Sequence, residues 1–139
     1  MGRLAKWKRW QGVPRAVWQL RDGLLSLGFA SDIENYDEEH FGNVLIEMHR
    51  GDLRIRIVKD RSEWSTQAQA GSEWYDTVAW EGVTEGSLTS AAPSLEERAK
   101  FLLERANEVE TASQRPGVVD DLRRWMERWR EQWRAQSSA

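Results

Sequence analysis

The sequence predicts an α+β protein: an N-terminal helix, an antiparallel sheet of about three or more strands with a central hairpin, and two C-terminal helices. Two observations lead to this prediction. Apolar residues alternate on both sides of Gly51-Asp52, which indicates a β-hairpin. Apolar residues at helical spacing lie before and after this region. Because helical and strand segments are segregated along the chain, the class is α+β rather than α/β.

The chain begins with a basic segment. Residues 1–12 are predicted to form a basic arm or a short helix that contains Trp7 and Trp10. Pro14 suits the first turn of a helix, and Gly28 suits its C-terminal end. The helical spacing between them is carried by Val17, Leu20, Leu24 and Leu27. Residues 30–42 are expected to be a polar, acidic connection.

The central hairpin has the clearest pattern in the sequence. Its inward positions are Val44, Ile46, Met48, Leu53, Ile55 and Ile57. Glu47, Arg54 and Arg56 are expected to share the opposite face as an ordinary solvated surface. A third strand is predicted around residues 64–70, followed by a turn at Gly71-Ser72. The pattern does not assign residues 74–80.

Two helices are predicted in the last third of the chain. Ser94 and Glu97 form a capping box that starts the first one after a loop over residues 86–93. Arg115-Pro116-Gly117 separates the two helices. The last helix is expected to begin near Val118, and residues 135–139 are expected to be a disordered tail. The whole chain, 1–139, is predicted to be a single domain.

The composition narrows the class of protein. Cysteine is absent, so disulfides and thiolate metal sites are excluded. No apolar run approaches the roughly 20 residues that cross a bilayer, and the N-terminus has no apolar core of a secretory signal. These features predict a cytoplasmic protein that does not enter a membrane.

Charge is strongly segregated although the net charge is only -3. Residues 1–21 contain six basic side chains and no acid, whereas residues 22–49 contain seven acids and no Lys or Arg. Residues 62–97 again contain seven acids and no Lys or Arg. Such blocks produce surface fields that steer charged partners.

No motif predicts catalysis, so the protein is not expected to be an enzyme. The sequence lacks the nucleophile elbow, the dinucleotide-binding and P-loop glycine patterns, and the paired-histidine zinc motif. No cofactor and no metal are therefore expected. An enzyme acting through scattered carboxylates remains an alternative that would require a deep pocket with convergent Asp or Glu side chains.

The cluster Asp37-Glu38-Glu39-His40 has three interpretations. A metal or acid–base site needs converging ligands, but adjacent residues point in different directions. A solvated acidic loop without a specific role is the second interpretation. The third, an acidic surface that binds a protein partner, is favoured.

Tryptophan is abundant, with nine residues. Trp125, Trp129 and Trp133 fall on one face of a helix, which predicts either a core stripe or a homodimer interface. Lys6-Trp7-Lys8-Arg9-Trp10 combines cations with aromatics as single-strand nucleic-acid binders do. The acidic isoelectric point of about 5.5 makes nucleic acid an unexpected partner.

Residues 36–80 resemble small cytoplasmic immunity proteins of bacterial polymorphic toxins. The resemblance rests on Phe41-Gly42-Asn43 before a strand, the hairpin, Asp60-Arg61 with Trp64, and Trp74-Tyr75-Asp76. It implies a protein that neutralises a cognate toxin, many of which are nucleases with basic clefts, by stoichiometric binding through an acidic surface. The expected protein-binding residues are Asp32, Glu34, Tyr36, Asp37, Glu38 and Glu39, with Trp74, Tyr75 and Asp76 as a second patch. The alternative is an acidic, dimeric, secretion chaperone-like protein that binds an effector segment.

Overall fold

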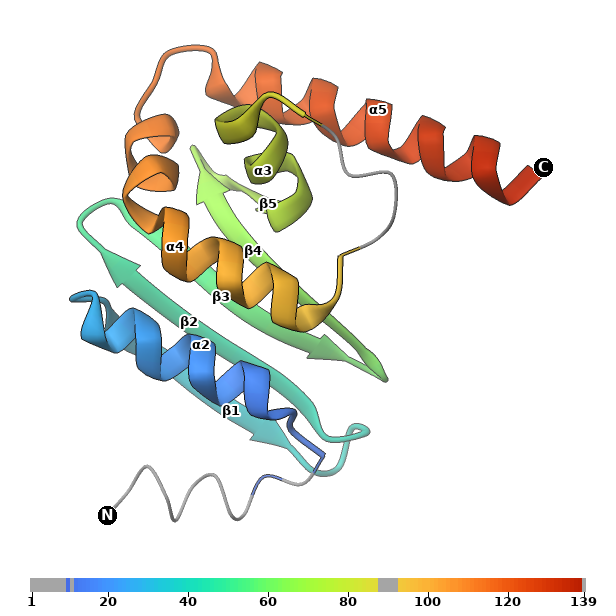
Figure 1. Ribbon diagram of the computed structural model, residues 1–139. Coiled ribbons are helices and arrows are strands. Elements are labelled where there is room, and N and C mark those ends of the chain that lie inside the picture. The colour runs from blue at the N-terminus through green and yellow to red at the C-terminus, as the bar shows by residue number, and fades with distance from the viewer. Residues whose placement is uncertain (1–9, 11, 88–92, 139) are drawn as a thin grey trace.

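The computed structural model describes residues 10, 12–87 and 93–138 of the chain. The elements are α2 (Arg15–Ser26), β1 (Ala30–Asp37), β2 (Asn43–Arg50), β3 (Leu53–Asp60), β4 (Glu63–Ala70), β5 (Glu73–Asp76), α3 (Thr77–Glu85), α4 (Leu95–Ser113) and α5 (Val118–Ser138). The α+β class is confirmed (Figure 1). Three helices follow the sheet, however, so the predicted order with two C-terminal helices is wrong.

All five strands form one antiparallel meander in the order β1-β2-β3-β4-β5. The predicted hairpin around Gly51 joins β2 to β3, and the predicted third strand is β4. The prediction of a connection over residues 30–42 is wrong, because Ala30–Asp37 pair with β2 as the edge strand β1. The other new strand is β5, which pairs with β4 and forms the opposite edge.

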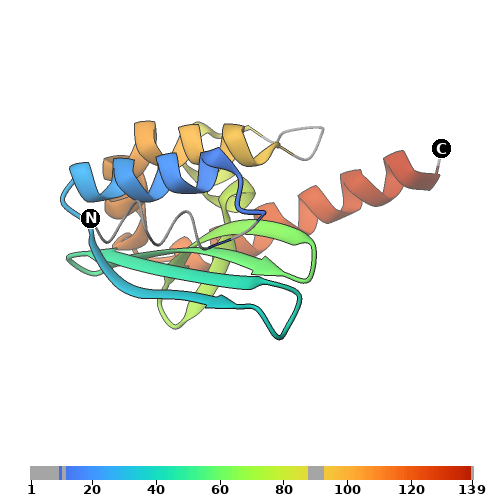
Figure 2. The ribbon, with the colours of Figure 1, turned by 90° about the horizontal axis from the view of Figure 1, so that it is seen from below.

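The helices cover one face of the sheet. In Figure 2, α2 and α4 lie side by side over this face, and the opposite face carries no helix of the described chain. The covered face is apolar because alternate residues of β2 and β3 point toward the helices. The core includes Ile46, Ile55, Leu20 and Leu102, none of which exceeds 1% exposure.

The ends of the helices follow their sequences. Gly28, at φ +93°, ends α2, and the amide of Phe29 donates to the carbonyl of Leu24, as in a Schellman motif. The predicted capping box is present at the start of α4. Helix α3 begins directly after β5 because the Asp76 carboxylate accepts a hydrogen bond from the amide of Val78.

Helix α5 packs on α3 and then continues past the rest of the protein, as Figures 1 and 2 both show. Four of the five residues expected to form a disordered tail, 135–138, belong to this helix. Most of the predicted basic arm lies outside the described residues, because only residues 10 and 12 of it are described. One described member, Trp10, is only 9% exposed and is part of the core.

Candidate functional site: an acidic turn beside an open sheet face

The face of the sheet opposite the helices is not covered by a helix of the described chain (Figure 2). Strand register assigns its side chains, because residues directly opposite each other in a ladder point to the same face. One row crosses all five strands and consists of Ile33, Glu47, Arg56, Gln67 and Asp76. This register also confirms that Glu47, Arg54 and Arg56 share one face.

Three apolar side chains on neighbouring strands of this open face form what we call the apolar strip: Ile33, Leu45 and Val58. Ile33 on the edge strand is 39% exposed, and Leu45 and Val58 are half-buried. Leu45 is paired with Val58 in the ladder and with Asn35 on the other side. A small apolar centre with charged neighbours is the composition of a protein interface.

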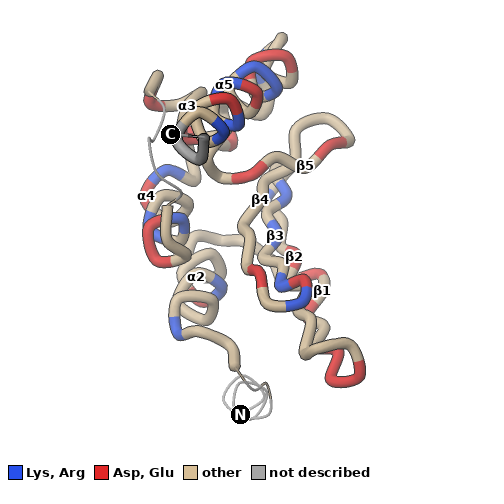
Figure 3. Tube along the Cα trace, turned by 90° about the vertical axis from the view of Figure 1, so that its right-hand side faces the viewer, with Lys and Arg blue, Asp and Glu red and all other residues tan. Residues whose placement is uncertain are grey.

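The acidic turn, residues 37–42, joins β1 to β2 next to this strip (Figure 3). Asp37 organises the turn, because its carboxylate accepts a hydrogen bond from the amide of Glu39 at 3.2 Å and contacts Nδ1 of His40 at 2.7 Å. The backbone closes the turn through the amide of Asn43, which donates to the carbonyl of His40 at 3.1 Å. Glu38 and Glu39 are exposed.

Phe41 is the most unusual residue of the acidic turn. Its side chain is 76% exposed, the highest value among the exposed large hydrophobic residues, and its φ is +61°. A bulky residue rarely adopts this left-handed conformation, which costs about 1–3 kcal/mol and persists only where the surroundings impose it. The turn therefore holds an aromatic side chain in solvent at a cost in stability.

The surroundings of Phe41 explain how this conformation is held. Lys59 donates through Nζ to the carbonyl of Phe41 at 3.4 Å. The Asn43 side chain accepts a hydrogen bond from the amide of Arg61 at 2.7 Å, which joins the acidic turn to the β3–β4 turn. A Cβ at Gly42 would lie 3.2 Å from the ring of Tyr36, so the chain passes closely over that ring. The acidic turn is therefore preorganised, which reduces the entropy lost on binding.

Toward the β5 edge of the open face, Arg56 of the central strand β3 contacts Trp74 of β5. The guanidinium of Arg56 lies 4.3 Å from the centroid of the Trp74 ring, and its Nε donates to Gln67 at 2.6 Å. Partial burial lowers the pKa of Arg56, and the negative charge of Glu47 partly opposes that shift. Glu47 also accepts a hydrogen bond from Arg54 at 3.3 Å. These contacts leave the β4–β5 side of the face polar and internally paired.

The structure divides the first predicted patch between the two faces of the sheet. Asp37, Glu38 and Glu39 belong to the acidic turn, and Asp32 contacts His49 at 2.7 Å beside the bulge in β1. Glu34 and Tyr36 pair with inward residues of β2 and therefore lie on the helix side.

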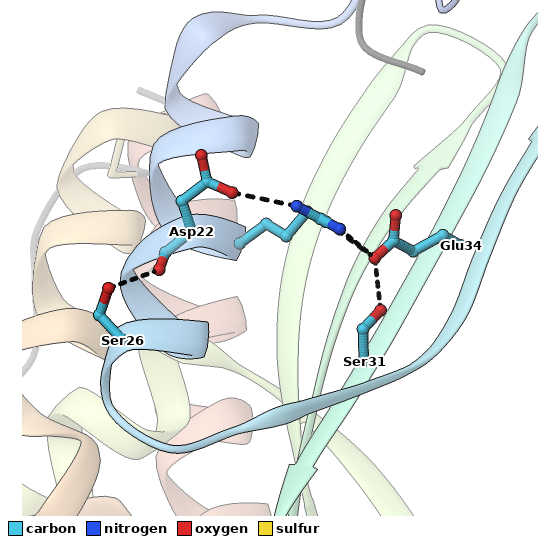
Figure 4. Close-up of polar contacts among 5 residues, drawn as sticks. Asp22, Ser26, Ser31 and Glu34 are labelled. Atoms are coloured by element: carbon cyan, nitrogen blue, oxygen red, sulfur yellow. Dashed lines mark hydrogen bonds and ion pairs between the residues drawn. The ribbon is translucent and has the colours of Figure 1, made fainter. Parts of the chain in front are cut away.

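On the helix side, Glu34 forms an ion pair with Arg21 of α2 at 2.7 Å. Figure 4 shows the polar contacts around this pair, with Asp22 and Ser26 on α2 and Ser31 and Glu34 on β1. The ring of Tyr36 stacks on that of Trp10 at 5.7 Å. Both residues thus have structural contacts in the free protein.

The second predicted patch is also divided. Trp74 lies on the open face, and its ring meets Arg56. Tyr75 is 7% exposed and donates its hydroxyl hydrogen bond to Glu73, while Asp76 caps α3. The acidic turn follows β1 and Trp74 belongs to β5, so the two patches lie at opposite edges of the sheet.

The tryptophan stripe of α5 changes its surroundings along the helix. Trp125 packs against α3 so closely that a Cβ at Gly82 would lie 2.6 Å from its ring. Trp129 and Trp133 stack on each other at 5.9 Å, and Trp133 is 45% exposed. Trp125 thus has the close contacts expected of a core stripe, whereas Trp133 is largely exposed and the homodimer interface stays a prediction.

The sequence pattern does not single out Phe41 or the apolar strip. Phe41 lies directly before a predicted strand, and a single apolar residue in a charged segment is not by itself a signal of a binding site. Ile33 was overlooked because its segment was interpreted as a connection. Leu45 and Val58 were assigned to the hairpin without a role for its outer face.

Among the described residues, no group of three or more His, Asp or Glu side chains is placed to hold a metal ion. No helix in the described part of the chain is both long and apolar enough to span a bilayer. Neither a family model, a curated protein nor a solved structure matches the chain.

Proposed function

We propose that this protein is a non-catalytic binding protein whose partner docks on the acidic turn and the adjacent apolar strip. The observation that carries the proposal is Phe41, which is 76% exposed at a φ of +61°. Binding energy in interfaces concentrates in a few aromatic anchors surrounded by neighbours that exclude water. An exposed, preorganised phenylalanine with acidic neighbours has the form of such an anchor.

The partner proposed is a bacterial toxin, which this protein neutralises in the cytoplasm by stoichiometric binding. The support is the resemblance of residues 36–80 to immunity proteins and the negative charge of the acidic turn. Carboxylates on a surface replace phosphates in the basic cleft of a nuclease, and charge complementarity accelerates capture. Asp37, Glu38 and Glu39 provide the charge, and Phe41 provides the apolar contact.

A secretion chaperone-like dimer is the alternative function, and one observation favours it. Trp129 and Trp133 lie in the C-terminal half of α5, and Trp133 is 45% exposed. An aromatic stripe of this kind suits a dimer interface. In this alternative the dimer, rather than the acidic turn, provides the surface for an unfolded effector segment.

The test is a pull-down from the native bacterial lysate at low and high salt with two baits, the wild type and Phe41→Ala. Each captured protein is then expressed alone and together with the wild type. The proposed function requires a folded basic protein that arrests growth alone, is neutralised at a one-to-one ratio, and escapes the Phe41→Ala bait.

Other outcomes contradict it. A non-toxic secreted protein, held through an unfolded segment by a dimeric bait, would replace the immunity function by the chaperone function. A partner retained equally by the wild type and Phe41→Ala would move the binding site away from the acidic turn. Capture of no protein at either salt concentration would overturn the proposal.

A further inference from the structure

The three residues of the second predicted patch meet at a groove that the proposed function does not use. Trp74, Tyr75 and Asp76 line one side of this groove, and residues of α5 line the other. Its volume is about 450 Å³. Trp74 and Asp76 lie on the open face and Tyr75 on the helix side, so the groove follows the outer edge of β5. Figures 1 and 3 both show α5 on this side of the sheet, and we call the space the edge groove.

Strand β5 has unpaired backbone groups at its outer edge. Ala70 pairs with Glu73 across the two-residue turn Gly71-Ser72, and residues that flank such a turn form a hydrogen-bonded pair. Hydrogen-bonded pairs alternate along an antiparallel ladder, so Tyr75 also bonds to β4, whereas the N–H and C=O of Trp74 point outward. No hydrogen bond within the described chain uses these two groups. An unpaired edge is a template on which an extended peptide adds a strand.

Helix α5 brings one paired and two unpaired charges to the edge groove. Arg123 donates to Glu73 at 2.6 Å, which links the helix to β5. Glu127 and Arg130 follow on the same face of α5, and both are exposed. No residue of the described chain forms a hydrogen bond or an ion pair with either of these two side chains. The α5 side of the edge groove therefore offers a ligand one carboxylate and one guanidinium.

We propose that the edge groove binds an extended peptide segment of a partner protein, which adds a strand to β5 and carries one basic and one acidic side chain. Hydrogen bonds to the backbone of Trp74 hold the segment, its basic side chain meets Glu127, and its acidic side chain meets Arg130. From Arg123 to Arg130 the helix rises about 10 Å, which about four residues of an extended strand span. The site does not rest on the proposed function, because the acidic turn lies at the opposite edge of the sheet.

The first test pans a phage library of random seven-residue peptides on the full-length protein. Enriched peptides should contain a basic and an acidic residue and bind in the micromolar range by calorimetric titration. The charge swap Glu127→Lys/Arg130→Glu should weaken their binding about tenfold or more, because it replaces two attractions by two repulsions. Exchanging the basic and the acidic residue of a peptide should restore its affinity for this variant. The control Lys100→Glu/Glu104→Lys exchanges two exposed charges on α4 at the same net charge and should leave the affinity unchanged.

The second test detects the added strand by hydrogen exchange. The amide of Trp74 should exchange about tenfold more slowly when the protein is saturated with an enriched peptide, because the peptide backbone accepts its hydrogen bond. The amides of Glu73 and Tyr75 should change less, since they are already bonded to β4. Phe41→Ala should leave the peptide affinity and this protection unchanged, because Phe41 lies beside β1.

Four outcomes would overturn the inference. The first is that no peptide is enriched above panning without the protein, and the second is that the charge swap at Glu127 and Arg130 leaves the affinity unchanged. The third is that the exchange rate of the Trp74 amide does not change on binding. In each of these cases the proposed function stands, because its pull-down reports on Phe41. The fourth is that Phe41→Ala loses the peptides, which would place them at the acidic turn and support the proposed function instead.

Discussion

Arg21 and Glu34 form an ion pair between α2 and the edge strand β1, with side chains only 10% and 7% exposed. Two nitrogens of the guanidinium, Nε and Nη2, approach the same carboxylate oxygen, at 2.8 Å and 2.7 Å. Ser31 also donates a hydrogen bond to this oxygen, and Asp22 accepts one from Arg21. The pair holds the edge strand against the helix at a position where an apolar contact would be usual.

Removing one member of this pair should be strongly destabilising. Arg21→Met removes the guanidinium that contacts the buried Glu34 carboxylate, at a cost of about 3–5 kcal/mol in the free energy of unfolding. The double variant Arg21→Met/Glu34→Leu should be closer to the wild type, because both charges of the pair are removed. Urea unfolding measures both, with exposed Arg15→Met on the same helix as the control. A double variant as unstable as the single one would show that the pair contributes more than charge compensation.

Phe41 should contribute to partner binding while its positive φ lowers the stability of the folded protein. Phe41→Ala removes the exposed anchor and should weaken partner binding by about 2 kcal/mol or more, since that is the range of interface hot spots. Phe41→Gly should lose the same affinity while being about 1 kcal/mol more stable than Phe41→Ala, because glycine adopts a positive φ without steric cost. Calorimetric titration measures the change in affinity, and urea unfolding measures the change in stability. Equal stability of the Ala and Gly variants would mean that the conformation at residue 41 is unstrained.

Charge reversal in the acidic turn should act on the rate of capture. Glu38→Lys/Glu39→Lys should lower the association rate constant about tenfold at low salt and much less at high salt, because steering is screened. Stability should stay within about 0.5 kcal/mol, as both side chains are exposed. Asp37 is left unchanged, because its carboxylate organises the turn. Stopped-flow measurements give the association and dissociation rate constants. A change confined to the dissociation rate constant would contradict electrostatic steering.

The elements that the sequence predicted correctly have local signals. The β2–β3 hairpin has alternating residues and a Gly-Asp turn, and α4 has its capping box. Edge strand β1 was missed because its inward position is Glu34, which is buried as part of an ion pair, whereas apolar Ile33 points outward. That arrangement reverses the usual alternation, and only the partner residue Arg21 on another element explains it.

Helix α3 was missed for a different reason. Thr77, Val78, Ala79 and Trp80 are all buried, so the short helix lacks the polar side that makes a helical period visible. For the candidate site, the charge block located Asp37, Glu38 and Glu39. The exposure of Phe41 depends on its positive φ, which the sequence pattern does not specify.

The two halves of the α5 stripe should respond differently to mutation. Gly82→Ala places a Cβ 2.6 Å from the Trp125 ring and should cost about 1–3 kcal/mol by overpacking the α3–α5 contact. Trp133→Ala should leave the free energy of unfolding almost unchanged, because this side chain is 45% exposed. If α5 forms a homodimer, Trp133→Ala should instead halve the mass measured by light scattering. A large decrease in the free energy of unfolding of a monomeric Trp133→Ala variant would assign Trp133 to the core.

Glu73 should make stability depend on pH at the acidic end. Hydrogen bonds from Tyr75 and then Arg123 lower the pKa of Glu73 below its ordinary value of 4.5. A carboxylate with a lowered pKa in the folded state contributes stability that is present above the ordinary pKa and is lost as the pH falls through the folded value. The difference in unfolding free energy between the wild type and Glu73→Gln should therefore be constant near neutral pH. It should decrease as the pH falls below 4.5.

Urea unfolding from about pH 7 to about pH 3 measures this difference. Tyr75 is the largest cause of the shift, so the same comparison in a Tyr75→Phe background should give a smaller difference. Arg123 remains in that background and still donates to Glu73 at 2.6 Å, so part of the pH dependence should survive. A difference that is independent of pH in both backgrounds would show that Glu73 stabilises the β5–α5 contact through its shape and hydrogen-bonding atoms, and that its charge contributes nothing.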